Sequence, residues 1–143
     1  MVTSEAPPSC QLLELPRLPD PRGSLTFLHG AREIPFAIRR AYWIYEVPGG
    51  EVRGGHAYRT LHEVFIALSG SFDVTVDDGR GSTARYVLNR SYTGLYVPPM
   101  MWRTLENFST NAVCLILASE HYDEGDYMRD YDEFCHARAR SRR

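Results

Sequence analysis

The stretch that decides the fold is GEVRGGHAYRTLHEVFIALSG, residues 50–70. Glycines begin and end it, and its second half, from Glu63, reads as a strand rich in β-branched and aromatic residues. His56 and Tyr58 are two residues apart on an extended segment, so alternation places both side chains on one face of a strand. The stretch therefore predicts strands that bring a histidine and a phenol together on the inner face of a β-fold.

Further strands follow on both sides of this stretch. The turn Asp77-Asp78-Gly79 predicts a tight hairpin between two of them, because this residue pattern tolerates the backbone of two-residue hairpin turns. Strands that recur about every ten residues are typical of a sandwich or barrel. The candidates are residues 24–29, 41–47, 63–68, 71–76, 84–88, 94–97 and 112–118.

Two segments resemble the two sequence motifs of the cupin family. The first matches at every interval, through Gly50, His56-Ala57-Tyr58, Glu63 and Gly70. The second matches with a shorter first interval and with Met100 in place of a glycine; it runs through Gly94, Pro98-Pro99-Met100, Arg103 and Asn107. The resemblance implies an all-β fold, a cupin-type jelly-roll barrel, over residues 21–120.

The two ends of the chain differ from this middle part. Residues 1–20 are rich in proline and leucine and predict an extended arm. From about Asp123, aromatic residues recur at helical spacing (Tyr127, Tyr131, Phe134), so residues 121–143 predict one C-terminal α-helix followed by a basic tail. The arm's leucines are too apolar to lie free in water, and an arm exchanged between two copies would bury them and cover a sheet edge.

Composition excludes several classes of function. All 16 basic residues are arginine, so Schiff-base chemistry on a lysine is impossible and a phosphate-binding P-loop is ruled out. The net charge of −2 argues against nucleic-acid binding, and no apolar run is long enough to span a membrane. Residues 1–8 lack the segments of a signal peptide, and the three cysteines have no CxxC spacing, so a cytoplasmic location is predicted.

The residues at the cupin ligand positions argue against a metal. A metal cupin uses His, His, Glu and His, and these four positions are His56, Tyr58, Glu63 and Arg103 here. A protonated guanidinium offers no lone pair and repels a cation. We therefore expect a metal-free site, without a cofactor, that works by acid–base chemistry.

His56 is the candidate general base, since an imidazole titrates near neutrality. Tyr58 is the candidate group that protonates or hydrogen-bonds an enol oxygen, and Arg103 would stabilise the same anion or bind phosphate. The alternative is that His56 and Tyr58 are core residues of a non-catalytic barrel. The other substrate-binding candidates are Arg22 in a tight turn, Arg53, Glu63, Tyr45 and Tyr96. Arg22 and Arg53 are equally compatible with solvated turns.

The chain also resembles the sugar 3,4-ketoisomerases that act on dTDP-4-keto-6-deoxyglucose, the FdtA/QdtA-like or WxcM-like family. The resemblance rests on segments spread over about residues 20–135. They include Arg22-Gly23-Ser24-Leu25, Arg53-Gly54-Gly55-His56-Ala57, Gly94-Leu95-Tyr96-Val97-Pro98-Pro99, Ala118-Ser119-Glu120-His121-Tyr122-Asp123 and Asp126-Tyr127-Met128-Arg129-Asp130-Tyr131.

This resemblance implies a metal-free homodimer with exchanged N-terminal strands. The implied reaction moves a keto group from C4 to C3 of a dTDP-linked 4-keto-6-deoxysugar, and an aminotransferase would use the product. One residue departs from the family pattern, because Tyr58 stands where the family has a second histidine. Two alternatives stay open: a dTDP-sugar 3,5-epimerase, and a sugar-nucleotide-binding cupin without catalytic activity.

Overall fold

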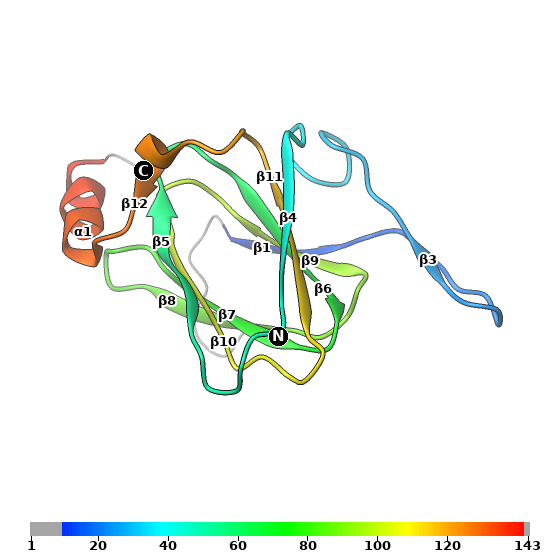
Figure 1. Ribbon diagram of the computed structural model, residues 1–143. Helices are drawn as coiled ribbons and strands as arrows, with labels where there is room; N and C mark the ends of the chain where they lie inside the picture. Colours follow the sequence, from blue (N-terminus) through cyan, green and yellow to red (C-terminus); the bar gives the residue numbers. More distant parts are fainter. Residues whose placement is uncertain (1–9, 142–143) are drawn as a thin grey trace.

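The computed structural model describes residues 10–141, and residues 1–9 and 142–143, which include the first part of the predicted arm, lie outside it. Two five-stranded antiparallel sheets pack face to face (Figure 1). The first has the strand order β1 (Gln11–Glu14), β9 (Thr93–Val97), β6 (Glu63–Ser69), β11 (Val113–Ala118) and β4 (Arg40–Tyr45). The second has the order β12 (Tyr127–Met128), β5 (Arg53–Tyr58), β10 (Trp102–Glu106), β7 (Phe72–Asp77) and β8 (Thr83–Leu88). The prediction of an all-β jelly roll is confirmed, although the two sheets do not close into one barrel.

The main core lies between the two sheets. Phe65, Phe72 and Leu95 have no exposed surface there, and each such side chain contributes about 1.5–3 kcal/mol by leaving water. The strand alternation that buries these residues on the inner face also turns His56 and Tyr58 inward from β5. The core therefore fixes the register of the strands that carry the candidate site.

The hairpin predicted at Asp77-Asp78-Gly79 is confirmed, but its loop is longer than a two-residue turn and spans residues 78–82. It joins β7 to β8, and the Asp77 and Asp78 carboxylates accept hydrogen bonds from the backbone of Gly79 and Arg80 at 2.7 Å. Gly79 has a φ of +74°, a conformation that costs glycine little. Met100, in place of the motif's glycine, adopts a φ of +62° at the turn into β10, a conformation that favours glycine.

The strand predicted over residues 24–29 is much shorter than expected. Only Leu25–Thr26 (β3) is extended and paired, and its partner is Arg17–Leu18 (β2). This two-stranded hairpin projects away from the body of the molecule, as Figure 1 shows, so β3 has no second neighbour to lengthen it. Before the hairpin, β1 pairs with β9 of the same chain and Leu15 is buried, so this part of the predicted arm belongs to the first sheet.

The C-terminal helix begins later than the sequence pattern suggests. Helix α1 spans Tyr131–Arg140, with Asp130 as its N-cap. The segment before it forms a 3₁₀ turn (Glu124–Asp126) and then strand β12, in which Tyr127 pairs with Tyr58 of β5. Pairing to the edge of β5 prevails over helical periodicity here, and as a result Tyr127 lies in the candidate site rather than on a helix.

Candidate active site

The site is a cavity of about 260 Å³ at the end of the sandwich where β4, β5, β10 and β12 meet. The lining residues used below are Tyr42, Arg53, His56, Tyr58, Arg103, Tyr127 and Arg129. The structure therefore brings together four of the predicted site residues, His56, Tyr58, Arg53 and Arg103. It adds Tyr42, Tyr127 and Arg129, to which the sequence had assigned no role.

His56 and Tyr58 are in direct contact. His56 Nε2 and the Tyr58 hydroxyl are 3.0 Å apart, and the two rings meet edge-to-face with centroids at 4.9 Å. Burial lowers the pKa of His56 to about 3, and the charges of Arg103 and Arg129 act in the same direction. The imidazole is therefore neutral at neutral pH and free to accept a proton. Burial raises the pKa of Tyr58, so its phenol holds its proton.

Arg103 and Glu63 form a buried ion pair beneath the cavity. Arg103 Nε lies 2.9 Å from Glu63 Oε1, Nη2 lies 3.1 Å from Oε2, and both side chains are 2% exposed. Nη1 donates to the carbonyl of Gly54, whose φ is +72° and where a Cβ would lie 2.5 Å from Nη1. This close approach and the positive φ favour glycine, which explains the first glycine of the Arg-Gly-Gly-His sequence before the candidate base.

This pairing defines what two predicted binding residues do in the structure. Both oxygens of Glu63 are engaged with Arg103, and Oε2 also accepts a hydrogen bond from the Tyr42 hydroxyl at 2.7 Å. Arg103 contributes positive charge close to His56 and packs over the Tyr58 ring, with its Cζ 5.4 Å from the ring centroid. The expectation of a metal-free site stays a prediction. The structure shows that Glu63, which occupies one of the four metal-ligand positions of the cupin motif, is already paired with the Arg103 guanidinium.

Three other predicted residues lie away from this cavity. Tyr45 is 57% exposed on β4, on the face opposite Tyr42. Tyr96 lies on the outer face of the first sheet, where its hydroxyl is 2.7 Å from His62 Nδ1. Arg22 lies in the projecting hairpin, hydrogen-bonded to Asp20. Alternation along β4 is the signal that favours Tyr42 over Tyr45, since Arg40, Tyr42 and Ile44 share the inward face and Tyr45 points outward.

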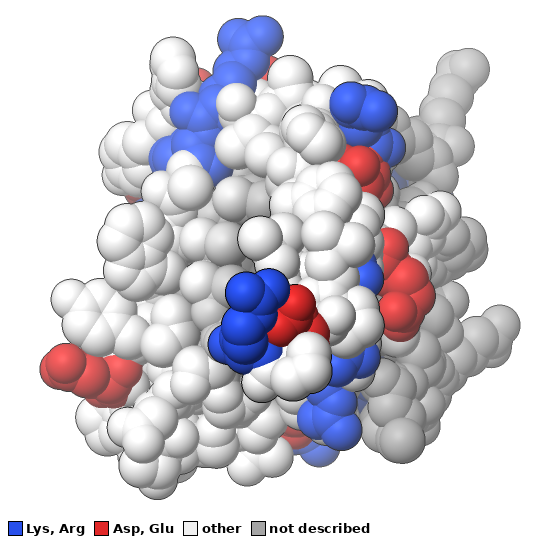
Figure 2. All heavy atoms as spheres, turned by 90° about the vertical axis from the view of Figure 1, so that its right-hand side faces the viewer, with Lys and Arg blue, Asp and Glu red and all other residues white. Residues whose placement is uncertain are grey.

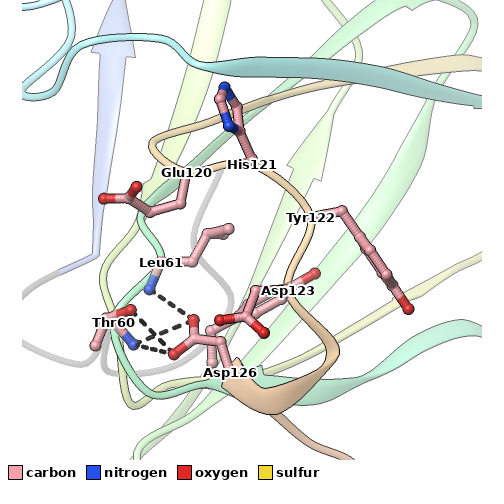
Figure 3. Close-up of a pocket in the computed structure, with 8 residues that line it drawn as sticks. Thr60, Leu61, Glu120, His121, Tyr122, Asp123 and Asp126 are labelled. Carbon is pink, nitrogen blue, oxygen red and sulfur yellow. Dashed lines mark hydrogen bonds between the residues drawn. The ribbon is translucent and has the colours of Figure 1, made fainter.

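A second cavity of about 290 Å³ lies next to the first and shares Tyr58 as a wall. Figure 3 shows its lining, with Asp126 pointing back toward the turn after β5. The Asp126 carboxylate accepts hydrogen bonds from Thr60 N, Thr60 Oγ1 and Leu61 N at 3.0–3.1 Å. These bonds connect the segment before β12 to the turn after β5. They therefore stabilise the position of Tyr127 beside Tyr58.

A two-sheet jelly roll with a histidine and a phenol in contact in its cavity places the chain in the class of cupin-type β-folds. Comparison with known proteins gives the family. The family model described as FdtA, WxcM-like, C-terminal, matches residues 8–139. The chain belongs to this family.

Individual relatives in this family are named as sugar 3,4-ketoisomerases or 3,4-oxoisomerases. The chain is 40% identical over 124 residues to the TDP-4-oxo-6-deoxy-α-D-glucose-3,4-oxoisomerase of Aneurinibacillus thermoaerophilus, covering 87% of this chain and 88% of the relative. A 3,4-ketoisomerase structure from Helicobacter canadensis is 40% identical, with a TM-score of 0.88 over 92% of this chain and 98% of that one. The QdtA 3,4-ketoisomerase from Thermoanaerobacterium thermosaccharolyticum, solved in complex with TDP-4-keto-6-deoxyglucose, is 34% identical, with a TM-score of 0.91 over 96% and 100%.

Proposed function

We infer that this protein is a sugar 3,4-ketoisomerase that converts dTDP-4-keto-6-deoxyglucose into its 3-keto isomer. Relatives of this activity at 40–42% identity cover 87–92% of the chain. The observation that carries the mechanism is the 3.0 Å contact between His56 Nε2 and the Tyr58 hydroxyl in the cavity. A neutral base and a protonated acid in contact are the two groups that this isomerisation needs.

The reaction is internally balanced. His56 takes the proton from C3, and the electron pair of that C–H bond forms the enediolate between C3 and C4. Tyr58 then donates its proton to C4 on the way to the product, while the C3 hydroxyl loses its proton and O4 gains one. C3 is oxidised and C4 is reduced by the same two electrons, so no external oxidant or reductant is required. The proton on His56 exchanges with solvent, and Tyr58 regains a proton from His56 across their contact, which restores both groups.

The nucleotide end of the substrate needs cations at the cavity mouth. Arg53 and Arg129 line the cavity with exposed guanidinium groups, which suit the diphosphate of a sugar nucleotide. We assign the diphosphate to these two side chains. Binding roles for Arg22, Tyr45 and Tyr96 stay predictions, because none of the three faces this cavity.

The test is proton NMR of dTDP-4-keto-6-deoxyglucose in deuterated water with the purified protein. We expect a 3-keto product carrying deuterium at C4. Exchange at both C3 and C5 without a 3-keto product would instead identify a 3,5-epimerase. Binding without exchange or product would identify a non-catalytic sugar-nucleotide protein.

We also propose that the protein is a homodimer. The projecting β2–β3 hairpin exposes Leu18 (58%) and Leu25 (54%), and beside its base an apolar groove of about 370 Å³ is lined by residues such as Phe27, Ile38 and Leu68. Figure 2 looks onto the side from which the hairpin projects, and uncharged residues cover most of it. A hairpin that reaches across a second copy would cover this apolar surface on both chains. Among residues 10–141, no helix is long and apolar enough to cross a membrane; the cytoplasmic location stays a prediction.

A further inference from the structure

Tyr58 has a chemical problem as an acid. Giving its proton to carbon leaves a phenolate, and burial, with the nearby carboxylate of Glu63, disfavours that charge. The site must therefore hold groups that accept the negative charge while the proton is away. The same need does not arise for a histidine at this position, because an imidazolium becomes neutral when it donates.

Tyr127 is in contact with Tyr58. Their ring centroids are 4.5 Å apart, and the ring of Tyr127 also lies 4.9 Å from that of His56. Hydrogen bonding with Tyr127 is among the causes, after burial and the charge of Glu63, that raise the pKa of Tyr58. Tyr127 is therefore the phenol that lies next to the acid. Its position is fixed by the β12–β5 pairing and by the Asp126 hydrogen bonds shown in Figure 3.

Arg40 stands behind Tyr127. Hydrogen bonding with Tyr127 is among the causes that raise the pKa of Arg40, against burial, which lowers it. The Arg40 Cζ lies 4.7 Å from the Tyr42 ring centroid and 5.7 Å from that of Tyr122, whose ring in turn lies 5.7 Å from that of Tyr127. Its Nε is buried with no hydrogen-bond partner. Arg103 and Arg129 both have carboxylate partners, Glu63 and Glu124, whereas no ion pair within residues 10–141 involves Arg40. Arg40 is therefore the cation beside the phenols whose charge no carboxylate neutralises.

We propose that Tyr127 and Arg40 form a charge-accepting pair that allows Tyr58 to act as the acid. This inference rests on the proposed ketoisomerase function. As the Tyr58 O–H bond breaks and the C4–H bond forms, the Tyr127 O–H bond breaks and its proton moves to the Tyr58 oxygen. The electron pair left on the Tyr127 oxygen then faces the Arg40 guanidinium. The proton held by His56 returns to Tyr58, and the Tyr58 proton returns to Tyr127.

Tyr127 and Arg40 are positioning residues in this scheme, because both act on the sugar through Tyr58. Preorganised charge of this kind is worth most in a water-poor cavity, and it needs no rearrangement during the reaction. The groups with charge or titratable protons that face Tyr127 are His56 and Tyr58 on β5, Arg40 on β4, and Tyr122, Glu124 and Arg129 on the segments beside β12.

The first test compares Tyr127→Phe with Tyr122→Phe. Tyr122 is an exposed neighbour whose hydroxyl donates to Glu124, so its substitution is the matched control. In deuterated water we expect Tyr127→Phe to slow product formation about 10- to 100-fold, while exchange at C3 continues because His56 is intact. Tyr122→Phe should match wild type in both rates. Wild-type product formation by Tyr127→Phe would overturn the proposal.

The second test asks whether Arg40 acts through Tyr127. Arg40→Met should show the same split between exchange and product formation, and the double variant should be no slower than the slower single variant. Arg40→Lys, which keeps the charge, should recover part of the loss. Fully additive losses in the double variant would overturn the coupling between the two residues.

The third readout does not depend on activity. With tyrosine labelled with ¹³C at the phenol carbon, the Tyr127 signal is the one lost in Tyr127→Phe. At neutral pH its chemical shift should change in Arg40→Met, because the guanidinium beside its ring is gone. An unchanged chemical shift overturns the role of Arg40, even if the wild-type protein isomerises no sugar. Absence of both exchange and product in the wild type would instead count against the ketoisomerase function.

Discussion

His56 is the residue on which the proposed chemistry depends most directly. It is half-buried, it contacts Tyr58 at 3.0 Å, and it is the only histidine lining the cavity. His56→Asn keeps a polar side chain of similar size but removes the base. We expect turnover to fall by about 10²–10⁴-fold, with loss of deuterium exchange at C3 and little change in dTDP affinity measured by calorimetry.

The matched control is His136→Asn on the exposed face of α1, which should leave turnover unchanged. Persistent C3 exchange in His56→Asn at the wild-type rate would show that another group abstracts the proton.

The depressed pKa of His56 has a consequence for pH dependence. A general base is active when deprotonated, so activity is lost as the pH falls through its pKa. With that pKa at about 3, kcat/KM should stay nearly constant from about pH 8 down to about pH 5. A histidine with its ordinary pKa of about 6.5 would already be half protonated at pH 6.5. An acid limb of the kcat/KM profile centred near that value would contradict the burial argument.

At the scale of elements, β12 is the piece that completes the site. Only two residues pair with β5, so the Asp126 carboxylate supplies much of its attachment. Asp126→Ala leaves the backbone N–H groups of Thr60 and Leu61 without this acceptor. We expect a loss of about 1–3 kcal/mol in the free energy of unfolding, measured by urea titration, together with slower product formation.

Asp130→Ala separates the two effects. It removes the N-cap of α1 and should cost about 1 kcal/mol of stability. Since Asp130 has no bond to β5, product formation should stay at the wild-type rate. Equal losses of activity in both variants would mean that general destabilisation, and not the attachment of β12, limits the reaction.

The elements also show what the sequence could and could not predict. Alternation and spacing located β4, β6, β7, β8, β9 and β11 and placed His56 and Tyr58 on one face, because those signals are local. Tyr127 was assigned to a helix, since its spacing to Tyr131 and Phe134 is helical, and only its pairing with Tyr58, 69 positions earlier in the numbering, decides otherwise. The buried contact of Arg103 with Glu63 equally depends on two strands of different sheets, a relation that no local pattern encodes.

At the scale of the whole molecule, the prediction concerns the dimer. Leu18→Asp with Leu25→Asp places two carboxylates on the projecting hairpin. If the hairpin packs on a second copy, sedimentation velocity should show the mass falling from twice 16.3 kDa to 16.3 kDa at micromolar concentration. Val52→Asp changes an equally exposed apolar residue (53%) that lies outside the hairpin, and it should leave the mass unchanged. A wild-type protein of 16.3 kDa at that concentration would contradict the proposal.

The strand order also determines how quickly this chain can fold. Neighbouring strands in the first sheet pair residues that are far apart in the chain. Strand β4 pairs with β11 through Arg40 with Ala118 and Tyr45 with Val113, and β1 pairs with β9 through Gln11 with Tyr96. Each pairing must close a long loop before its hydrogen bonds and buried side chains repay the lost chain entropy. High contact order of this kind is associated with folding in about milliseconds to seconds rather than microseconds. Stopped-flow fluorescence should therefore show slow refolding, and a microsecond phase carrying the full amplitude would mean that the two sheets nucleate from local contacts after all.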